Sequence, residues 1–450
     1  MRFIVRKRGE MMNLQSLELN NFRGVSHAVL PFDGKSAVIY GINGMGKSTI
    51  LQACNLLFFR ILSSITVSTL GSERVLQIED SDIKIGEIFS KISMDVNIEG
   101  KNYHYFRKAE QNGKRVHSRS EAQELAMQIV SSYLGAYESV EEEETDDTDK
   151  GAQKKLVLNR NNMPIYALYG VNRYVADRIN NKLERDDKLF GKLEAWRDTF
   201  DPTINFQLFF EWFRGRQELE NSRKVEEETF CDPQLDAVRN AVLRILDNDF
   251  SDIKIKISDE DAQMVAIKHN TELSIAQLSE GEKCILAMTG DLARKLAIAN
   301  PSRENPLEGE GIVLIDEVDL HLHPSWQGRI MPLLFRTFPN VQFIVTTHSP
   351  KVLSEITDEA QIFEICQKDD DIVVTKRGIM SGWDINHIMR DFMHTDILNQ
   401  KTEALIDQIH EYIDNEEFDR AENLVDQLAE LTNEMNLDVV RARTLIHRER

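Results

Sequence analysis

The chain has little cysteine, no long apolar stretch and fewer basic than acidic residues. Its four cysteines, Cys54, Cys231, Cys284 and Cys366, are far apart and lack metal-ligand spacing, which excludes a disulfide framework and suits a reducing compartment. No stretch approaches the roughly eighteen uninterrupted apolar residues of a membrane span, and no apolar run follows the basic start as in a signal peptide. These absences predict a cytoplasmic protein without membrane contact.

The charge balance argues against a general affinity for nucleic acid. The chain has 54 lysine and arginine residues against 75 aspartate and glutamate residues, a formal net charge of −21. Any DNA contact would therefore need a local basic patch. The acidic run at 138–149 is expected to be a solvated or disordered loop rather than a binding tail.

Residues 41–48, Gly-Ile-Asn-Gly-Met-Gly-Lys-Ser, fit the phosphate-binding pattern G-x-x-x-x-G-K-[ST]. An apolar strand at 36–40 precedes them and a helix start follows, which is the context that this pattern requires. We expect Lys47 to reach the β- and γ-phosphates of a nucleotide and the Ser48 hydroxyl to bind Mg²⁺. The alternative is a glycine-rich turn with a chance Lys-Ser pair. The nucleotide-binding residues assigned to this phosphate loop are Asn43, Gly44, Gly46, Lys47, Ser48 and Thr49.

Two further segments place carboxylates where phosphate chemistry needs them. Ser279 is predicted to cap a helix, with Glu282 three residues later as its reciprocal partner. About thirty residues on, the apolar strand 312–315 delivers Asp316 and Glu317 at its end. Asp316 would hold the Mg²⁺ shell and Glu317 would act as the catalytic group that faces the attacking water.

Residues 343–347 form another apolar strand, which ends at His348. In the order phosphate loop, Leu-Ser-x-Gly-Glu signature, apolar-Asp-Glu and Thr-His-Ser-Pro, these motifs resemble the ABC and structural-maintenance-of-chromosomes (SMC) ATPase superfamily. The resemblance implies an α/β fold of the ABC-type ATPase head. Such a head has a three-layer P-loop core, an antiparallel side sheet and a helical lobe, to which a C-terminal helical extension is added here.

That resemblance also implies ATP and Mg²⁺ as cofactors and a homodimer, or a higher oligomer, that sandwiches two nucleotides. Ser279, Gly281 and Glu282 of one copy would then meet the γ-phosphate held by Lys47 of the other copy. His348 would be the catalytic switch residue that senses this phosphate, and Asp319 would lie along the dimer seam.

The residues next to these motifs leave two assignments open. By the same resemblance, Arg23 lies near the nucleotide; taken alone, an arginine after a strand is a surface charge. Asn172 stands where the family has a glutamine that touches Mg²⁺ and water. His321 and His323 could suggest a metal site, but we expect instead a seam loop and a helix that Pro324 starts.

Four segments are expected along the chain: ATPase lobe I with the phosphate loop (1–175), a helical insertion in place of a long coiled coil (176–270), ATPase lobe II with the signature, Walker B and switch histidine (271–390), and a C-terminal helical module (391–450). The phenylalanine and tryptophan residues of the insertion are interpreted as core or dimer contact rather than a base-stacking surface. The C-terminal module has two readings, a cap on the core or a docking site for a partner.

The segments 318–327, 169–173 and 382–386 narrow the resemblance to bacterial ATPases of the Septu PtuA type. Those are defence ATPases found beside an HNH nuclease, sometimes within retron systems. The resemblance implies an anti-phage ATPase that regulates an HNH nuclease subunit, with a reverse transcriptase and its msDNA as further partners in a retron.

Two alternatives remain open: a nucleotide-gated scaffold with little turnover, and a RecF-like DNA-repair ATPase. No nuclease site is recognised in the chain itself, because Asp369–Asp371 lies in a predicted loop.

Overall fold

The computed structural model describes residues 11–42, 44–70, 76–117, 119–139, 154–158, 162–173, 191–246, 249–257, 262–368, 371–393, 400–433 and 435–450. Asn43, most of the acidic run at 138–149, and residues 369–370 lie outside these ranges. The first compact unit ends at Gly382 and the second begins at Trp383. Each unit is therefore described by itself.

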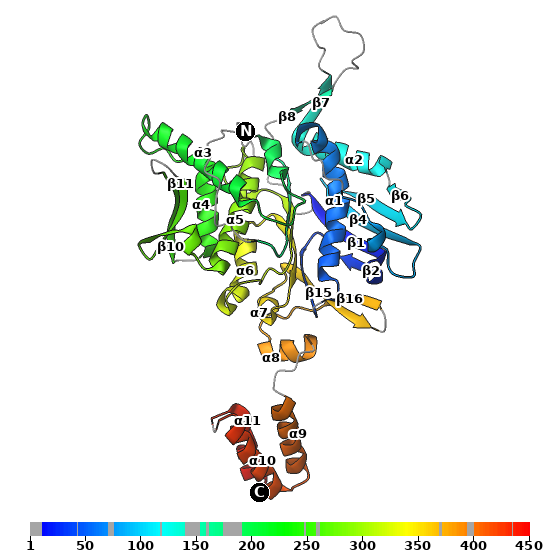
Figure 1. Cartoon of the computed structure of the whole chain (residues 1–450), viewed down its shortest axis with the longest axis vertical. Coiled ribbons are helices and arrows are strands. Elements are labelled where there is room, and N and C mark those ends of the chain that lie inside the picture. Colours follow the sequence, from blue (N-terminus) through cyan, green and yellow to red (C-terminus); the bar gives the residue numbers. More distant parts are fainter. Residues whose placement is uncertain are drawn as a thin grey trace, which may run out of the picture. The chain divides into compact units, whose positions relative to one another are not determined.

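A mostly parallel sheet forms the centre of the first unit (Figure 1). Its strands, in spatial order, are β16 (Asp371–Arg377), β15 (Ala360–Lys368), β3 (Ser36–Gly41), β14 (Val341–Thr347), β13 (Gly311–Ile315) and β9 (Ile165–Tyr169). The neighbours from β15 to β9 run parallel, and β16 pairs antiparallel at one edge. Every residue of β3, β9, β13 and β14 is buried, as expected for parallel strands covered on both faces.

An antiparallel sheet lies beside this core, as expected for the side sheet of an ABC-type head. Its order is β2 (Val25–Pro31), β1 (Asn13–Phe22), β4 (Phe89–Ile98), β5 (Lys101–Glu110) and β6 (Arg115–His117). In the hairpin between β4 and β5, Ile98 pairs with Lys101, and both turn residues, Glu99 and Gly100, have positive φ. Positive φ at both positions matches the twist of the flanking strands.

Helix α1 (Lys47–Leu70) packs between the two sheets, against β3 and β14 on one side and β4 and β5 on the other. Its segment Lys47–Ile65 is apolar and long enough to cross a membrane, but 78% of the tested window is buried inside the protein. Such burial is typical of a core helix. Further elements of this lobe are η2 (Asp80–Asp82), α2 (Arg119–Ile129), η3 (Val130–Leu134), β7 (Gly135–Ser139) and β8 (Lys154–Leu158).

A helical lobe covers the opposite side of the central sheet (Figure 1). It contains η5 (Lys192–Trp196), α3 (Phe206–Lys224), α4 (Pro233–Leu246), the antiparallel strands β10 (Phe250–Ile257), β11 (Ala262–Lys268) and β12 (Thr271–Ser274), η6 (Ile275–Gln277), α5 (Glu280–Ala299), η7 (Pro306–Glu308), α6 (Pro324–Thr337) and α7 (Pro350–Leu353). Its aromatic residues form core, as expected: Phe209, Trp212 and Phe213 are each 0% exposed. Burying one such side chain contributes about 1.5–3 kcal/mol.

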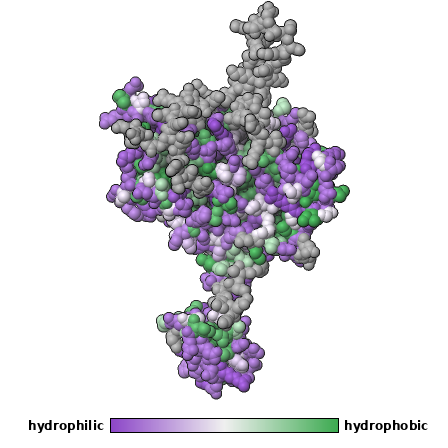
Figure 2. Space-filling model, viewed as in Figure 1, coloured by the Kyte–Doolittle hydropathy of each residue, from purple (hydrophilic) through white to green (hydrophobic). Residues whose placement is uncertain are grey.

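The second unit contains α8 (Ile385–His387), η8 (Ile388–Phe392), α9 (Gln400–Asp414), α10 (Phe418–Leu431) and α11 (Leu437–Glu449). The last three helices share a core that includes Ile409, Val425 and Val439. The C-terminal helical extension expected from the sequence is therefore present. On the face drawn in Figure 2, the described surface is predominantly hydrophilic, with apolar residues scattered among polar ones.

Gly41 offers a test of the central sheet, because a Cβ at this position would collide with the carbonyl oxygen of Ile365 on the neighbouring strand. We expect Gly41→Ala to lower the free energy of unfolding by about 3 kcal/mol, since backbone cannot yield as a side chain can. Gly113→Ala is the matched control: Gly113 has a φ of 80° but no atom within 4 Å of an added Cβ. Gly113→Ala should lower the free energy of unfolding by only about 1–2 kcal/mol, the cost of placing alanine in the left-handed conformation. Urea unfolding measures both, and equal losses would contradict the contact.

Candidate nucleotide-binding site

The carboxyl ends of the parallel strands meet at one edge of the central sheet. Thr347 at the end of β14 pairs with Tyr40 of β3, and Ile315 at the end of β13 pairs with Tyr169 of β9. Ligands of open α/β sheets bind at this kind of edge. The phosphate loop, the Asp316–Glu317 turn and His348 each follow directly after one of these strands, so the fold brings together motifs from distant parts of the sequence.

The phosphate loop has the conformation that its glycine residues permit. Gly44 and Gly46 have φ values of 81° and 85°, which L side chains rarely adopt. Lys47 is 6% exposed, and its ammonium donates hydrogen bonds to the carbonyl oxygens of Gly41 at 2.9 Å and Ile42 at 3.1 Å. Burial lowers the pKa of Lys47, while Glu317, Asp316 and Asp319 oppose that shift. A buried cation therefore lies among three carboxylates.

The two hydroxyl residues after Lys47 differ in exposure. Ser48 is exposed, so its hydroxyl is accessible to a cation. Thr49 is 7% exposed, and its backbone N–H donates to the carbonyl of Gly46 at 3.0 Å. Thr49 therefore helps to close the loop onto the first turn of α1.

Thr346 organises the Asp316–Glu317 turn. Its hydroxyl donates to Asp316 Oδ1 at 2.6 Å and accepts from the backbone N–H of Glu317 at 2.7 Å. Asp316 also donates its own N–H to the carbonyl of Tyr169 at 2.8 Å. Glu317 has a φ of 48°, a left-handed conformation that costs a non-glycine residue about 1–2 kcal/mol. The turn is thus held in a strained shape by the strand beside it.

His348 and Asp319 complete this edge. His348 Nε2 lies 3.9 Å from Glu317 Oε1. Burial and the nearby Lys47 lower the pKa of His348, against the opposing effect of the carboxylates, so the imidazole is neutral at pH 7. Asp319 Oδ1 accepts hydrogen bonds from the Thr347 hydroxyl at 2.5 Å and from the His348 N–H at 3.3 Å. Within this chain, Asp319 therefore holds the end of β14 in place through these hydrogen bonds.

The expected capping box at Ser279 is present. The Ser279 hydroxyl accepts from the Glu282 N–H at 3.3 Å, and the Ser279 N–H donates to Glu282 Oε2 at 2.9 Å. Burial raises the pKa of Glu282, but hydrogen bonds from Lys268 and Ser279 outweigh it and lower the pKa overall. Ser279 is exposed, and a Cβ at Gly281 would lie 2.7 Å from the carbonyl oxygen of His321. Among the described residues, no hydrogen bond joins Ser279 to the phosphate loop of its own chain.

Arg23 lies beside the loop but is already paired. Its Nε lies 2.8 Å from Asp82 Oδ1. The side chain of Ile372 lies between Gly24, the residue after Arg23, and Gly46 of the phosphate loop. Its Cδ1 would be 2.6 Å from a Cβ added at Gly24 and 3.4 Å from a Cβ added at Gly46. A nucleotide would therefore have to compete with Asp82 for this guanidinium.

Sequence reasoning singled out Asn172 but missed its neighbour. Asn172 is exposed, whereas Arg173 is 2% exposed and donates to the carbonyl oxygen of Asp316 at 2.9 Å. Arg173 is thus the residue of this loop whose side chain reaches the Asp316–Glu317 turn. The sequence gave no signal for that role, because an arginine three residues after Gly170 fits no motif used above.

The His321 and His323 pair is part of a helix start, as expected. His323 caps α6, its Nδ1 lies 2.8 Å from the Ser325 hydroxyl, and Pro324 is the first residue of the helix. Within the part of the chain that the structure describes, no three His, Cys, Asp or Glu residues are grouped to hold a metal ion. Ser48 and Asp316 instead offer hard oxygen donors, which suit Mg²⁺ when phosphate oxygens and water supply the other ligands.

Comparisons with known proteins agree with this geometry. A family model described as "AAA ATPase domain" matches residues 12–353. The chain is 27% identical to "Retron Ec83 probable ATPase" of Escherichia coli, over 84% of this chain and 76% of the relative. It is 30% identical to "Retron Vc95 probable ATPase" of Vibrio cholerae, over 77% and 72%. "Septu protein PtuA" of Bacillus mycoides is 26% identical over 78% of this chain and 40% of its own length.

Among solved structures, the chain is similar to an SMC head bound to the C-terminal winged-helix domain of ScpA, with a TM-score of 0.47 and 16% identity over 82% of this chain and 98% of that one. A second similar structure is the recombination mediator protein RecF-ATPrS, with a TM-score of 0.37 and 14% identity over 82% of this chain and 99% of that one.

Thr346→Val tests the turn, because valine keeps the side-chain shape but removes the hydroxyl that serves both Asp316 and Glu317. We expect the free energy of unfolding to fall by about 1–3 kcal/mol and ATP turnover to fall by at least about tenfold. Thr337→Val is the matched control, because the buried Thr337 hydroxyl has no hydrogen-bond partner in the described part of the chain; the turnover of this variant should not change. Unfolding by urea and steady-state phosphate release measure the two effects. Wild-type turnover in Thr346→Val would show that the hydroxyl does not position the turn.

Proposed function

Because the chain belongs to the AAA ATPase domain family, and is related to retron and Septu ATPases, we propose that it hydrolyses ATP with Mg²⁺ as a homodimer and thereby regulates a nuclease partner in anti-phage defence. The observation that carries the proposal is the convergence of Lys47, Asp316, Glu317 and His348 at one sheet edge. Phosphoryl transfer to water needs a phosphate anchor, a metal ligand and a group that orients the water.

Each residue of the edge has a distinct role in this reaction. The Lys47 ammonium gives up its hydrogen bonds to the two loop carbonyl oxygens and binds the β- and γ-phosphates instead. The backbone N–H groups of the loop from Asn43 to Thr49 bind the same phosphates. Ser48 and Asp316 hold Mg²⁺, which supplies charge stabilisation at the phosphate oxygens. Glu317 accepts a proton from the attacking water, and the neutral His348 beside it contacts the γ-phosphate. Arg23 assists only where the nucleotide displaces Asp82.

The signature supports a head-to-head dimer. Ser279 combines an exposed hydroxyl with the N-terminus of the 20-residue helix α5, two features that attract an anion. On the nucleotide edge, Ile42 and Val171 are 53% and 39% exposed, so apolar side chains flank the phosphate site. A second copy would cover them and bring Ser279, Gly281 and Glu282 to the γ-phosphate, with Asp319 at the seam.

The names of the relatives support a role in defence, and the chain's own chemistry supports a separate nuclease. Within the described residues, no acidic or histidine group of three could hold the metal of a nuclease. We therefore assign cleavage to an HNH subunit, and in a retron setting a reverse transcriptase and its msDNA join the complex. A scaffold that binds ATP with little turnover, and a RecF-like repair ATPase, are the competing functions.

Glu317→Gln separates the catalytic proposal from the scaffold. We expect this variant to bind ATP but to lose about 10²–10⁴-fold of the turnover, because the amide cannot accept the proton. With ATP it should accumulate as a dimer, measured by light scattering. Adding Ser279→Arg should leave a monomer that still binds ATP, whereas adding Ser251→Arg, at an exposed serine on β10, should still allow the dimer. Equal turnover in wild type and Glu317→Gln would favour the scaffold.

The partner is tested by gene neighbourhood and co-purification. We expect an HNH nuclease gene beside the gene for this chain, and its product to co-purify with the chain when the two are co-expressed. ATP should change the DNA cleavage of the wild-type complex but not that of a complex with Lys47→Ala, which loses its phosphate anchor. Salt-dependent DNA binding by the chain alone, without such a partner, would instead favour the repair ATPase.

A further inference from the structure

Arg173 is a buried cation that the proposed chemistry does not use directly. Its guanidinium Nη2 donates to the carbonyl oxygens of Asp316 at 2.9 Å and Glu317 at 2.5 Å, and its Nη1 lies 3.7 Å from Met288 Sδ on α5. None of these partners is a carboxylate, and among the described residues the Arg173 Nε has no hydrogen-bond partner. Burying a charge is costly, and the guanidinium donates its described oxygen-bound hydrogen bonds to the two carbonyl oxygens of the Asp316–Glu317 turn.

The carbonyl oxygens that Arg173 contacts belong to the strained turn. The Glu317 N–H is held from one side by the Thr346 hydroxyl, and the Glu317 carbonyl is held from the other side by Arg173. Together these bonds fix both peptide planes next to a residue with a φ of 48°. The direction of the Glu317 carboxylate follows from those planes, so a change at Arg173 would move the group that faces water.

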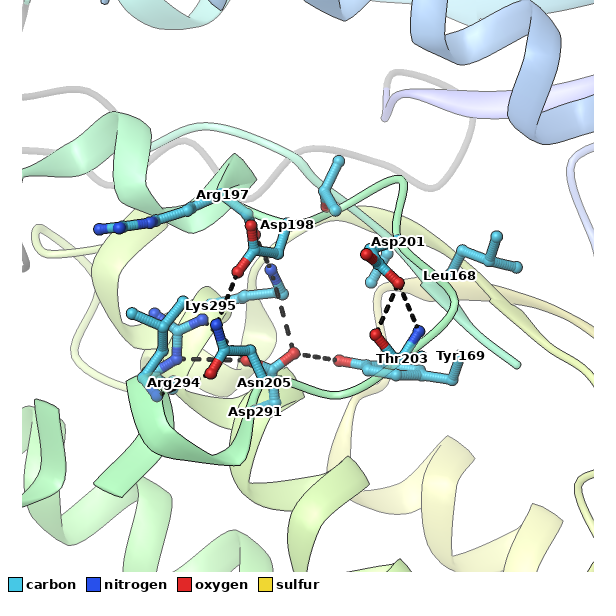
Figure 3. Close-up of a pocket in the computed structure, with 13 residues that line it drawn as sticks. Leu168, Tyr169, Arg197, Asp198, Asp201, Thr203, Asn205, Asp291, Arg294 and Lys295 are labelled. Carbon is cyan, nitrogen blue, oxygen red and sulfur yellow. Dashed lines mark hydrogen bonds and ion pairs between the residues drawn. The ribbon is translucent and has the colours of Figure 1, made fainter. Parts of the chain in front are cut away.

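A second contact ties the base of the same loop to α5. The Tyr169 hydroxyl donates to Asp291 Oδ2 at 3.0 Å, and Arg294 Nη2 donates to Asp291 Oδ1 at 2.7 Å (Figure 3). Lys295 Nζ lies 3.9 Å from Asp291 Oδ2 and donates to the Arg197 carbonyl at 2.7 Å. Burial raises the pKa of Asp291, but Lys295 and Arg294 outweigh it and lower the pKa. The loop 170–173 is therefore anchored to α5 at Tyr169 and again at Arg173.

We propose that Arg173 is a positioning residue through which the signature helix α5 fixes the Asp316–Glu317 turn, with Tyr169 and Asp291 as its second anchor. This inference rests on the proposed ATPase function. Ser279 begins the helix and Met288 lies nine residues later in the sequence, about 13 Å along the axis. One rigid helix thus presents its N-terminus to the nucleotide of the partner copy and holds the catalytic turn of its own.

Arg173→Met and Arg173→Lys test the positioning role through the split between kcat and KM. We expect Arg173→Met to lower kcat by about 10–100-fold, as small misplacements of a catalytic group do, with KM for ATP within about threefold of wild type. The kcat of Arg173→Lys should lie between those of wild type and Arg173→Met, because the lysine ammonium is a point donor and lacks the planar fork of the guanidinium. Tyr169→Phe should also lower kcat, but by a smaller factor than Arg173→Met.

Controls separate the role of Arg173 from loss of structure and from failure of the ATPase proposal. Arg216→Gln, which removes a pair with Asp232 elsewhere in the helical lobe, should leave kcat unchanged. Arg173→Met combined with Glu317→Gln should still dimerise with ATP. A wild-type kcat in Arg173→Met would overturn the inference, as would a joint loss of ATP binding and thermal stability. If Glu317→Gln itself keeps full turnover, the ATPase proposal fails instead.

Discussion

The site depends on the electrostatic interaction between the buried ammonium of Lys47 and the carboxylates around it. Burial lowers its pKa, and the charges of Asp316, Glu317 and Asp319 keep it from falling further. Its hydrogen bonds go only to loop carbonyls in the described chain, so it neutralises the carboxylates at a distance. A bound triphosphate would add negative charge beside Lys47, and a bound Mg²⁺ would add positive charge beside Asp316. The edge therefore favours the two ligands together over either one alone.

This charge arrangement exists because four parallel strands end in register. Because Ile315 pairs with Tyr169 and Thr347 pairs with Tyr40, the turns that follow these strands begin at the same level along the strand direction. A slip of one residue in any of these strands would turn its buried side chains toward the opposite face. Helix α1 packs against β3 and β14, which fixes the start of the helix, and with it Lys47, relative to the Asp316–Glu317 turn.

Much of this could be predicted from sequence, because the motifs are local. The strand before Gly41, the capping box at Ser279 and the strand before Asp316 each lie within a few residues of their signal, and all are present. The contacts that support the Asp316–Glu317 turn could not be predicted. Thr346 lies 29 residues from Glu317 in sequence, and Arg173 lies 144 away, so only the sheet order brings them together. The pairing of Arg23 with Asp82 was hidden for the same reason.

In the proposed dimer, helix α5 would connect two nucleotide sites, and its burial bears on how it would do so. Its residues from Lys283 to Ala299 are all buried, while Ser279 at its cap is exposed. A helix packed at the density of a protein interior moves as a unit rather than bending, so a displacement at the cap reaches Met288 and Asp291 undiminished. Arg173 and Tyr169 meet the helix at those residues. A γ-phosphate that engages Ser279 in one copy would thus bias the position of Glu317, which serves the other nucleotide.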